Sequence, residues 1–80
     1  MGFLHSQASK IDLPKSFSIP VGDGKKVEAT KHDGSTRYEI YEDGVMVAKL
    51  TPAKANRANE LAQAEDFSKV RAIVYSPFNF

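Results

Sequence analysis

The chain has 80 residues, of which 41% are hydrophobic and 26% are charged, so it is long enough for one small globular domain and too short for two. It contains no cysteine, which excludes disulfides and thiolate zinc sites. The net charge of +1 argues against a dedicated nucleic-acid binder, because such proteins usually carry a strongly basic surface. A domain this small has little stability to spare, and without disulfides a partner is the most available additional support.

The sequence offers no membrane-spanning or secretory segment. No apolar run approaches the ~20 residues that a helical span requires. The start of the chain lacks the basic and apolar pattern of a signal peptide. We therefore expect a soluble intracellular protein, either cytoplasmic or part of a larger assembly such as a virion.

Asp-Gly pairs recur every ten residues, at 23–24, 33–34 and 43–44. Tight hairpin turns need positive φ, which Gly adopts freely and Asp better than most residues. A ten-residue interval fits one short strand and one turn. Calcium loops also use Asp-Gly, but the further oxygen ligands that such loops need are missing. The pairs therefore predict an antiparallel β-meander of about four strands.

The stretches between these turns alternate apolar and polar residues, as half-buried strands do. In the first stretch, residues 16–21, Pro20 cannot donate to a ladder, which predicts a strand at a sheet edge. The last stretch, residues 45–50, is apolar on both faces except for Lys49. That pattern indicates a central strand or one that is covered on both sides.

A helix is predicted after the meander. Thr51 is a favoured N-cap, and Pro52 suits the first helical position because its missing N–H costs nothing there. The following residues are strong helix formers without glycine. The face expected to pack on the sheet is formed by Ala55, Ala58, Leu61 and Ala62.

Residues 70–75 then alternate again and predict a final strand. The predicted fold class is α+β, with the element order ββββαβ and one helix packed on the sheet. The place of the last strand stays open, beside residues 45–50 or between earlier strands. We expect an extended N-terminal arm over residues 1–14, a single domain over 15–76 and a C-terminal aromatic tail over 77–80.

Both ends of the chain carry large apolar side chains, which chain ends usually lack. These side chains either cover the sheet of their own domain or contact another protein. Because the predicted helix is rich in alanine, it supplies little apolar bulk, and the domain needs additional cover. The candidate partner-binding residues are Phe3, Leu4, Ile11, Leu13, Phe78 and Phe80.

No pattern of catalytic or ligand-binding residues stands out. His5 and His32 lack further ligands at metal-binding spacing, and no nucleophile or phosphate-loop motif is present. We therefore predict no catalytic residue, no metal and no cofactor, and a protein that is not an enzyme.

Nucleic-acid binding is the alternative. A small sheet followed by a helix occurs in several DNA- and RNA-binding modules. Basic side chains would contact phosphates and an aromatic ring would stack on a base. The residues in question are Arg37, Lys54, Arg57, Lys69, Arg71 and Tyr41.

Residues 36–75 combine a Tyr-x-Ile-Tyr-Glu-Asp-Gly hairpin with an Ala-rich helix and a predicted strand. In this the chain resembles small orphan proteins of phage and mobile-element genomes. The resemblance implies an accessory, inhibitory or virion-associated protein, and it carries over no functional residue. The leading hypothesis is a non-enzymatic protein-interaction module that binds a host target or an assembly subunit through its terminal arms or a sheet edge. The sequence leaves the oligomeric state open.

Overall fold

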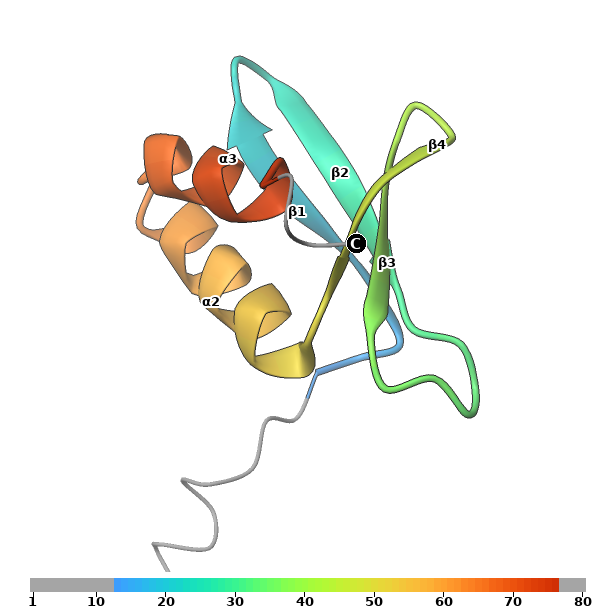
Figure 1. Ribbon diagram of the computed structural model, residues 1–80. Coiled ribbons are helices and arrows are strands. Elements are labelled where there is room, and N and C mark those ends of the chain that lie inside the picture. Colours follow the sequence, from blue (N-terminus) through green and yellow to red (C-terminus); the bar gives the residue numbers. More distant parts are fainter. Residues whose placement is uncertain (1–12, 77–80) are drawn as a thin grey trace, which may run out of the picture.

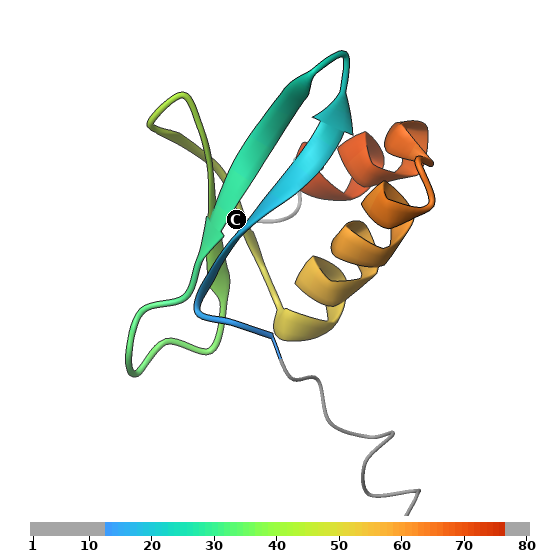
Figure 2. The same cartoon turned by 180° about the vertical axis from the view of Figure 1, so that it is seen from behind.

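The structure is a computed structural model that describes residues 13–76 (Figure 1). Four antiparallel strands form one sheet in the order β1-β2-β3-β4. Both helices lie on the same face of this sheet, as the two opposite views in Figures 1 and 2 show. The elements are β1 (Ser16–Gly22), β2 (Lys25–Thr30), β3 (Tyr38–Glu42), β4 (Val45–Leu50), α2 (Pro52–Gln63) and α3 (Phe67–Val74).

Two of the three Asp-Gly pairs form tight hairpin turns, and the third does not. Asp23 and Asp43 have φ of 58° and 52°, and the glycine after each is also at positive φ, as a two-residue hairpin turn requires. Between β2 and β3 the connection instead runs over residues 31–37 and contains a turn in which the Ser35 amide donates to the His32 carbonyl at 3.0 Å. The meander is thus confirmed, with one connection longer than the spacing predicted.

The predicted edge position of the first strand is confirmed, because among residues 13–76 β1 pairs only with β2. The prediction that residues 45–50 form a central or doubly covered strand is wrong. In the part of the chain that the structure describes, β4 pairs only with β3 and forms the opposite edge of the sheet.

Helix α2 agrees with its prediction. The Thr51 hydroxyl accepts a hydrogen bond from the Lys54 amide at 3.3 Å, and Pro52 begins the helix. The four residues that face the sheet are the predicted ones, Ala55, Ala58, Leu61 and Ala62, all buried.

The predicted last strand is a helix. Residues 67–74 form α3, which begins where the amides of Lys69 and Val70 donate to the Asp66 carbonyl, each at 3.1 Å. Val70 and Val74 are buried, while Ala72, expected on the same strand face, is exposed. Val70 and Val74 are four residues apart, which places them on the same face of a helix and also on the same face of a strand. Their spacing alone therefore does not distinguish the two structures. The fold is α+β with four strands and two helices, not ββββαβ.

The hydrophobic core lies between the sheet and the helices. Its largest fully buried side chains come from every strand and from α3: Ile19, Val27, Ile40, Leu50, Val70 and Val74. Because α2 contributes mainly alanines, it approaches the sheet closely, and α3 supplies the bulk that α2 lacks.

One polar contact ties α3 to the first hairpin. Arg71 donates from Nη1 to the Val21 carbonyl at 2.7 Å. Beside it, Gly22 has φ +98°, and a Cβ there would lie 2.8 Å from Nη1 of Arg71 and 3.1 Å from Cβ of Phe67. Only glycine suits both the backbone conformation and the close approach.

Candidate interaction edge

The outer edge of β4 is the most unusual feature of the described surface. Strand β4 pairs with β3 on one side, and no segment of residues 13–76 pairs on the other. Alternate N–H and C=O groups of an edge strand point outward without a ladder partner, which makes such an edge a template for another strand.

The side chains along this edge are apolar. Val45 is 63% exposed and Tyr75 is 38% exposed, and they are the exposed large hydrophobic residues of the described chain. Met46 and Val47 are half-buried, and only Lys49 carries a charge in β4. We call the surface formed by Val45, Met46, Val47 and Lys49 the β4 edge.

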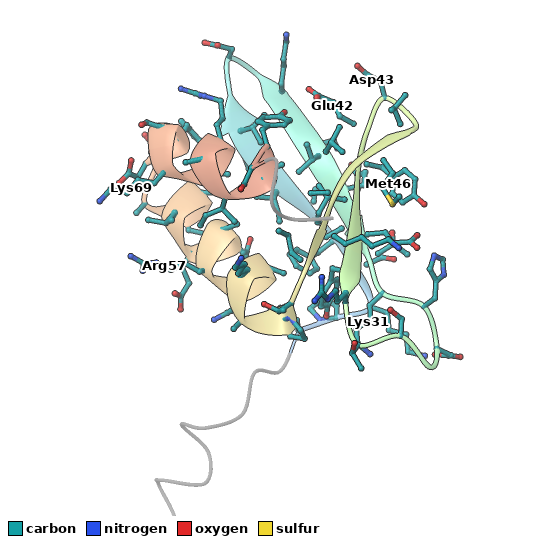
Figure 3. The ribbon with its side chains drawn as sticks, in the orientation of Figure 1. Lys31, Glu42, Asp43, Met46, Arg57 and Lys69 are labelled. Atoms are coloured by element: carbon teal, nitrogen blue, oxygen red, sulfur yellow. The ribbon has the colours of Figure 1, made fainter. Side chains whose placement is uncertain are left out.

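A bulge shapes the middle of β4. Ile40 pairs with Ala48 and Tyr41 with Met46, so Val47 is the extra residue. Beyond the bulge Met46 points away from the helices, as Figure 3 shows. A bulge increases the local twist and is one of the ways in which proteins protect an edge. Together with Lys49 it gives the β4 edge partial protection only.

The exposed hydrophobic residues meet at one corner. Val45 pairs with Glu42 across the β3–β4 hairpin. Tyr75, which follows α3, is hydrogen-bonded to the same Glu42. Burial, and then this hydrogen bond, raises the pKa of Tyr75 above its ordinary value. Glu42 therefore links the end of α3 to the start of β4, and both exposed hydrophobic residues, Val45 and Tyr75, lie near it.

The two ends of the β4 edge carry opposite charge. Glu42 and Asp43 lie together at the hairpin tip that precedes β4 (Figure 3), and Asp43 is exposed. Near the other end Lys49 is exposed and pairs across the strands with Glu39. The edge is thus apolar in its middle, acidic at its start and basic at its end.

The sheet face opposite the helices carries a polar network. Tyr41 donates its hydroxyl proton to Oε1 of Glu39 at 2.8 Å, and Nε2 of His32 lies 3.0 Å from the same oxygen. The Tyr41 hydrogen bond is the main cause that lowers the pKa of Glu39, with His32 and Lys49 acting in the same direction. The same hydrogen bond raises the pKa of Tyr41. These groups satisfy one another on an open surface, unlike an acid–base pair held in a closed pocket.

Two hollows open near the hairpin tips. Strands β2 and β3 pair only from Glu28–Tyr41 to Thr30–Glu39, and a space of about 590 Å³ lies beyond that point between the two hairpins. A smaller space of about 340 Å³ lies between the first hairpin and Phe67. Side chains of both charge signs line the larger hollow: Lys25, Lys26, Glu28, Glu42 and Asp43.

Among the predicted partner-binding residues, only Leu13 lies in the described part of the chain. It is half-buried and packs against the core. Tyr38 donates to the Pro14 carbonyl at 2.8 Å, which fixes the chain just after Leu13. The other candidates fall outside the described residues: Phe3, Leu4, Ile11, Phe78 and Phe80.

The residues of the nucleic-acid alternative are spread over the molecule. Arg57 and Lys69 point outward from the helices in Figure 3, and Tyr41 lies on the opposite face of the sheet, where its Cα partner is Met46. Lys54 is on α2 and Arg37 is in the loop before β3.

Several of these basic groups also have acidic or carbonyl partners nearby. Lys69 lies 3.5 Å from Asp66, and Arg57 lies 4.0 Å from Glu60. The Arg71 guanidinium contacts the Val21 carbonyl. The structure does not bring the six residues together on one surface.

Sequence reasoning missed the β4 edge, because the apolar character of residues 45–50 was taken as a sign of cover. One signal was present: Thr51-Pro52 follows directly, so α2 begins at the end of β4. Recognition of residues 67–74 as a helix would have left β4 without a second neighbour.

No match to the sequence was found among protein-family models, curated proteins or solved structures. No helix within residues 13–76 is long and apolar enough to cross a membrane. The same residues contain no group of three or more His, Cys, Asp or Glu side chains placed to hold a metal ion.

Proposed function

We propose that this chain is a non-enzymatic protein-interaction module whose β4 edge accepts an extended segment of another polypeptide. In this mode of binding, main-chain hydrogen bonds supply affinity and alternate side chains supply specificity. The observation that carries the proposal is the position of the most apolar strand, β4, at an edge of the sheet that no other segment of residues 13–76 pairs with.

The opposite edge of the same sheet provides an internal comparison. Strand β1 contains Pro20, has an irregular register between Pro20 and Gly22, and exposes Ser16 and Ser18. These features oppose the addition of a strand. Strand β4 also has a register shift, the bulge at Val47, but it has no proline and exposes Val45. The two edges of the sheet therefore differ in how readily they can pair with an additional strand.

The terminal residues belong to the same proposal. Residues 77–80 follow Ser76 and Tyr75, so the tail with Phe78 and Phe80 is attached next to the Val45–Tyr75 corner. We propose that Phe78 and Phe80 add to the contact that a partner makes. The resemblance to small orphan proteins of phage and mobile-element genomes makes a host target or an assembly subunit the expected partner class.

Nucleic-acid binding receives less support. It would need the six candidate residues on one continuous surface, whereas the basic ones divide between the two helices and the loop before β3, and Tyr41 lies on the far face of the sheet. A gel-shift titration at low salt that shows no complex would remove this alternative.

The proposal is tested by affinity capture from the source cell with three forms of the full chain: wild type, Val45→Lys and Ser16→Lys. Both substitutions place a lysine on an exposed position of an edge strand, one on β4 and one on β1. We expect Val45→Lys to lose the protein that the wild type captures and Ser16→Lys to keep it. Equal capture by all three forms, with all three folded, would contradict the proposal.

A further inference from the structure

We infer that one occupant of the β4 edge is the β4 strand of a second copy of this chain, paired antiparallel across a two-fold axis. This inference rests on the proposed function, because it names the segment that the edge accepts. It joins two four-stranded sheets into one continuous sheet.

Charge is the first argument. An antiparallel arrangement of two identical strands puts the start of each beside the end of the other. Asp43 of one copy, exposed at the hairpin tip before β4, then approaches the exposed Lys49 of the other copy, and the two-fold axis repeats the contact. A parallel arrangement would instead bring like charges together, which is unfavourable. The charge distribution along β4 is therefore self-complementary in the antiparallel sense only.

Apolar cover is the second argument. Between its charged ends β4 offers Val45, which is 63% exposed, and the half-buried Met46, while Val47 already packs against the core. Beta-branched residues paired across neighbouring strands stabilise a sheet. Pairing with a second β4 covers these side chains and satisfies the outward backbone groups in one step.

Closure is the third argument. Once two copies pair through β4, each end of the combined sheet is a β1 strand. Pro20 and the irregular register beside it make β1 a poor template, so growth stops at two copies. A two-fold interface that uses one patch twice forms a closed dimer and not a fibre.

The test is sedimentation velocity of the full-length chain over concentrations from micromolar to millimolar. We expect the wild type to shift from monomer to dimer within that range. Val45→Lys should raise the dissociation constant at least about tenfold, because it buries a like-charged pair and removes an apolar contact. Ser16→Lys, with the same added charge on the other edge, should dimerise as the wild type does.

A second variant covers the case in which Val45→Lys fails to fold. Lys49→Gln removes the basic end of the edge and should weaken dimerisation about threefold, as the loss of exposed ion pairs does. Added salt should weaken the wild-type dimer in the same way and leave Lys49→Gln nearly unchanged.

Three outcomes would overturn the inference: a wild type that stays monomeric at millimolar concentration, a dimer that Val45→Lys and Lys49→Gln both leave intact, and a dimer that Ser16→Lys disrupts instead. The failure of the proposed function is distinguishable from these. If the wild type is monomeric and Val45→Lys loses a different captured protein, a second copy is not the occupant. The β4 edge then remains the binding surface for that other protein. If Val45→Lys keeps both the dimer and every captured partner, the inference and the proposed function are both contradicted.

Discussion

Single residues determine how the first hairpin meets α3. Gly22 combines positive φ with a space that Arg71 and Phe67 limit, and Arg71 reaches the Val21 carbonyl past it. The sequence gives no sign of this role, because Gly22 precedes the Asp-Gly pair and reads as part of the turn. Such a contact joins residues fifty positions apart and depends on the position of α3.

Replacement of Gly22 by alanine should destabilise the domain. The left-handed conformation alone costs a non-glycine residue about 1–2 kcal/mol, and the displacement of Arg71 and Phe67 adds to that cost. Gly34→Ala is the matched control, because Gly34 also has positive φ, +84°, with nothing within 4 Å of the added Cβ. Urea unfolding should show a larger loss for Gly22→Ala than for Gly34→Ala. Equal losses would mean that the space beside Gly22 is not restrictive.

Tyr38 should govern part of the stability at alkaline pH. Its hydroxyl is buried and donates to the Pro14 carbonyl, and burial raises the pKa of Tyr38 above the ordinary value of 10.0. The fold therefore favours the protonated phenol. The corresponding stability is complete below the ordinary pKa and is lost as the pH rises through the raised value.

Tyr38→Phe should lose about 1 kcal/mol at neutral pH, the usual contribution of one hydrogen bond. As the pH rises from the ordinary pKa through the raised value, this difference should shrink, because the variant has no proton to lose. Denaturant unfolding at neutral pH and above pH 10 gives both differences. A difference that does not change with pH would contradict the role of the buried hydroxyl.

At the scale of elements, the sequence predicted what local patterns determine. The four strands, the tight turns at Asp23 and Asp43, the Thr51 cap and the buried face of α2 follow from backbone preferences and periodicity within a few residues. The errors concern α3 and β4, where the pattern of a short segment fits two structures. In residues 67–74 an alternating and a helical reading share Val70 and Val74, and burial against the sheet decides between them.

The error at β4 followed from the error at α3. A segment that is apolar on both faces is expected between two neighbours, and a fifth strand would have been one of them. Because that segment is a helix on one face of the sheet, β4 remains at the edge. The candidate site could not be predicted from the sequence. It exists because no segment of residues 13–76 pairs with the outer side of β4, and that depends on the fold of residues 67–74.

Ala72 offers a direct test of the helical assignment. It is exposed on α3, so packing has little influence and intrinsic preference decides. In a helix, Ala72→Val should cost about 0.5 kcal/mol and Ala72→Gly about 1 kcal/mol. In a strand, Ala72→Val should stabilise, because β-branched residues favour strands. Thermal unfolding of the two variants separates the structures, and a Val variant more stable than the wild type would contradict α3.

At the scale of the whole molecule, both helices cover the same face of the sheet. Helices α2 and α3 pack across the sheet, both contacting β1 and β4 on that face, and the β4 edge beyond them remains unpaired within the described chain. Phe3, Leu4, Ile11, Phe78 and Phe80 lie outside residues 13–76.

Removal of residues 77–80 should weaken binding more than it weakens the fold. These residues follow the Val45–Tyr75 corner directly, and the described core is closed without them. We expect reduced capture of the partner with a melting temperature close to that of the full chain. Removal of residues 1–12 is the parallel test for the N-terminal arm. If either truncation unfolds the domain, that segment belongs to the core and is not a free binding arm.

The most direct measurement of the central claim is photo-crosslinking in the source cell. A photoreactive amino acid placed at position 45 reports what contacts the β4 edge, whichever protein that is, and the same residue at position 16 reports on the β1 edge. The account predicts a discrete crosslinked protein, either a second copy or another chain, from position 45 and none from position 16. No crosslink from position 45, or equal crosslinks from both edges, would contradict it.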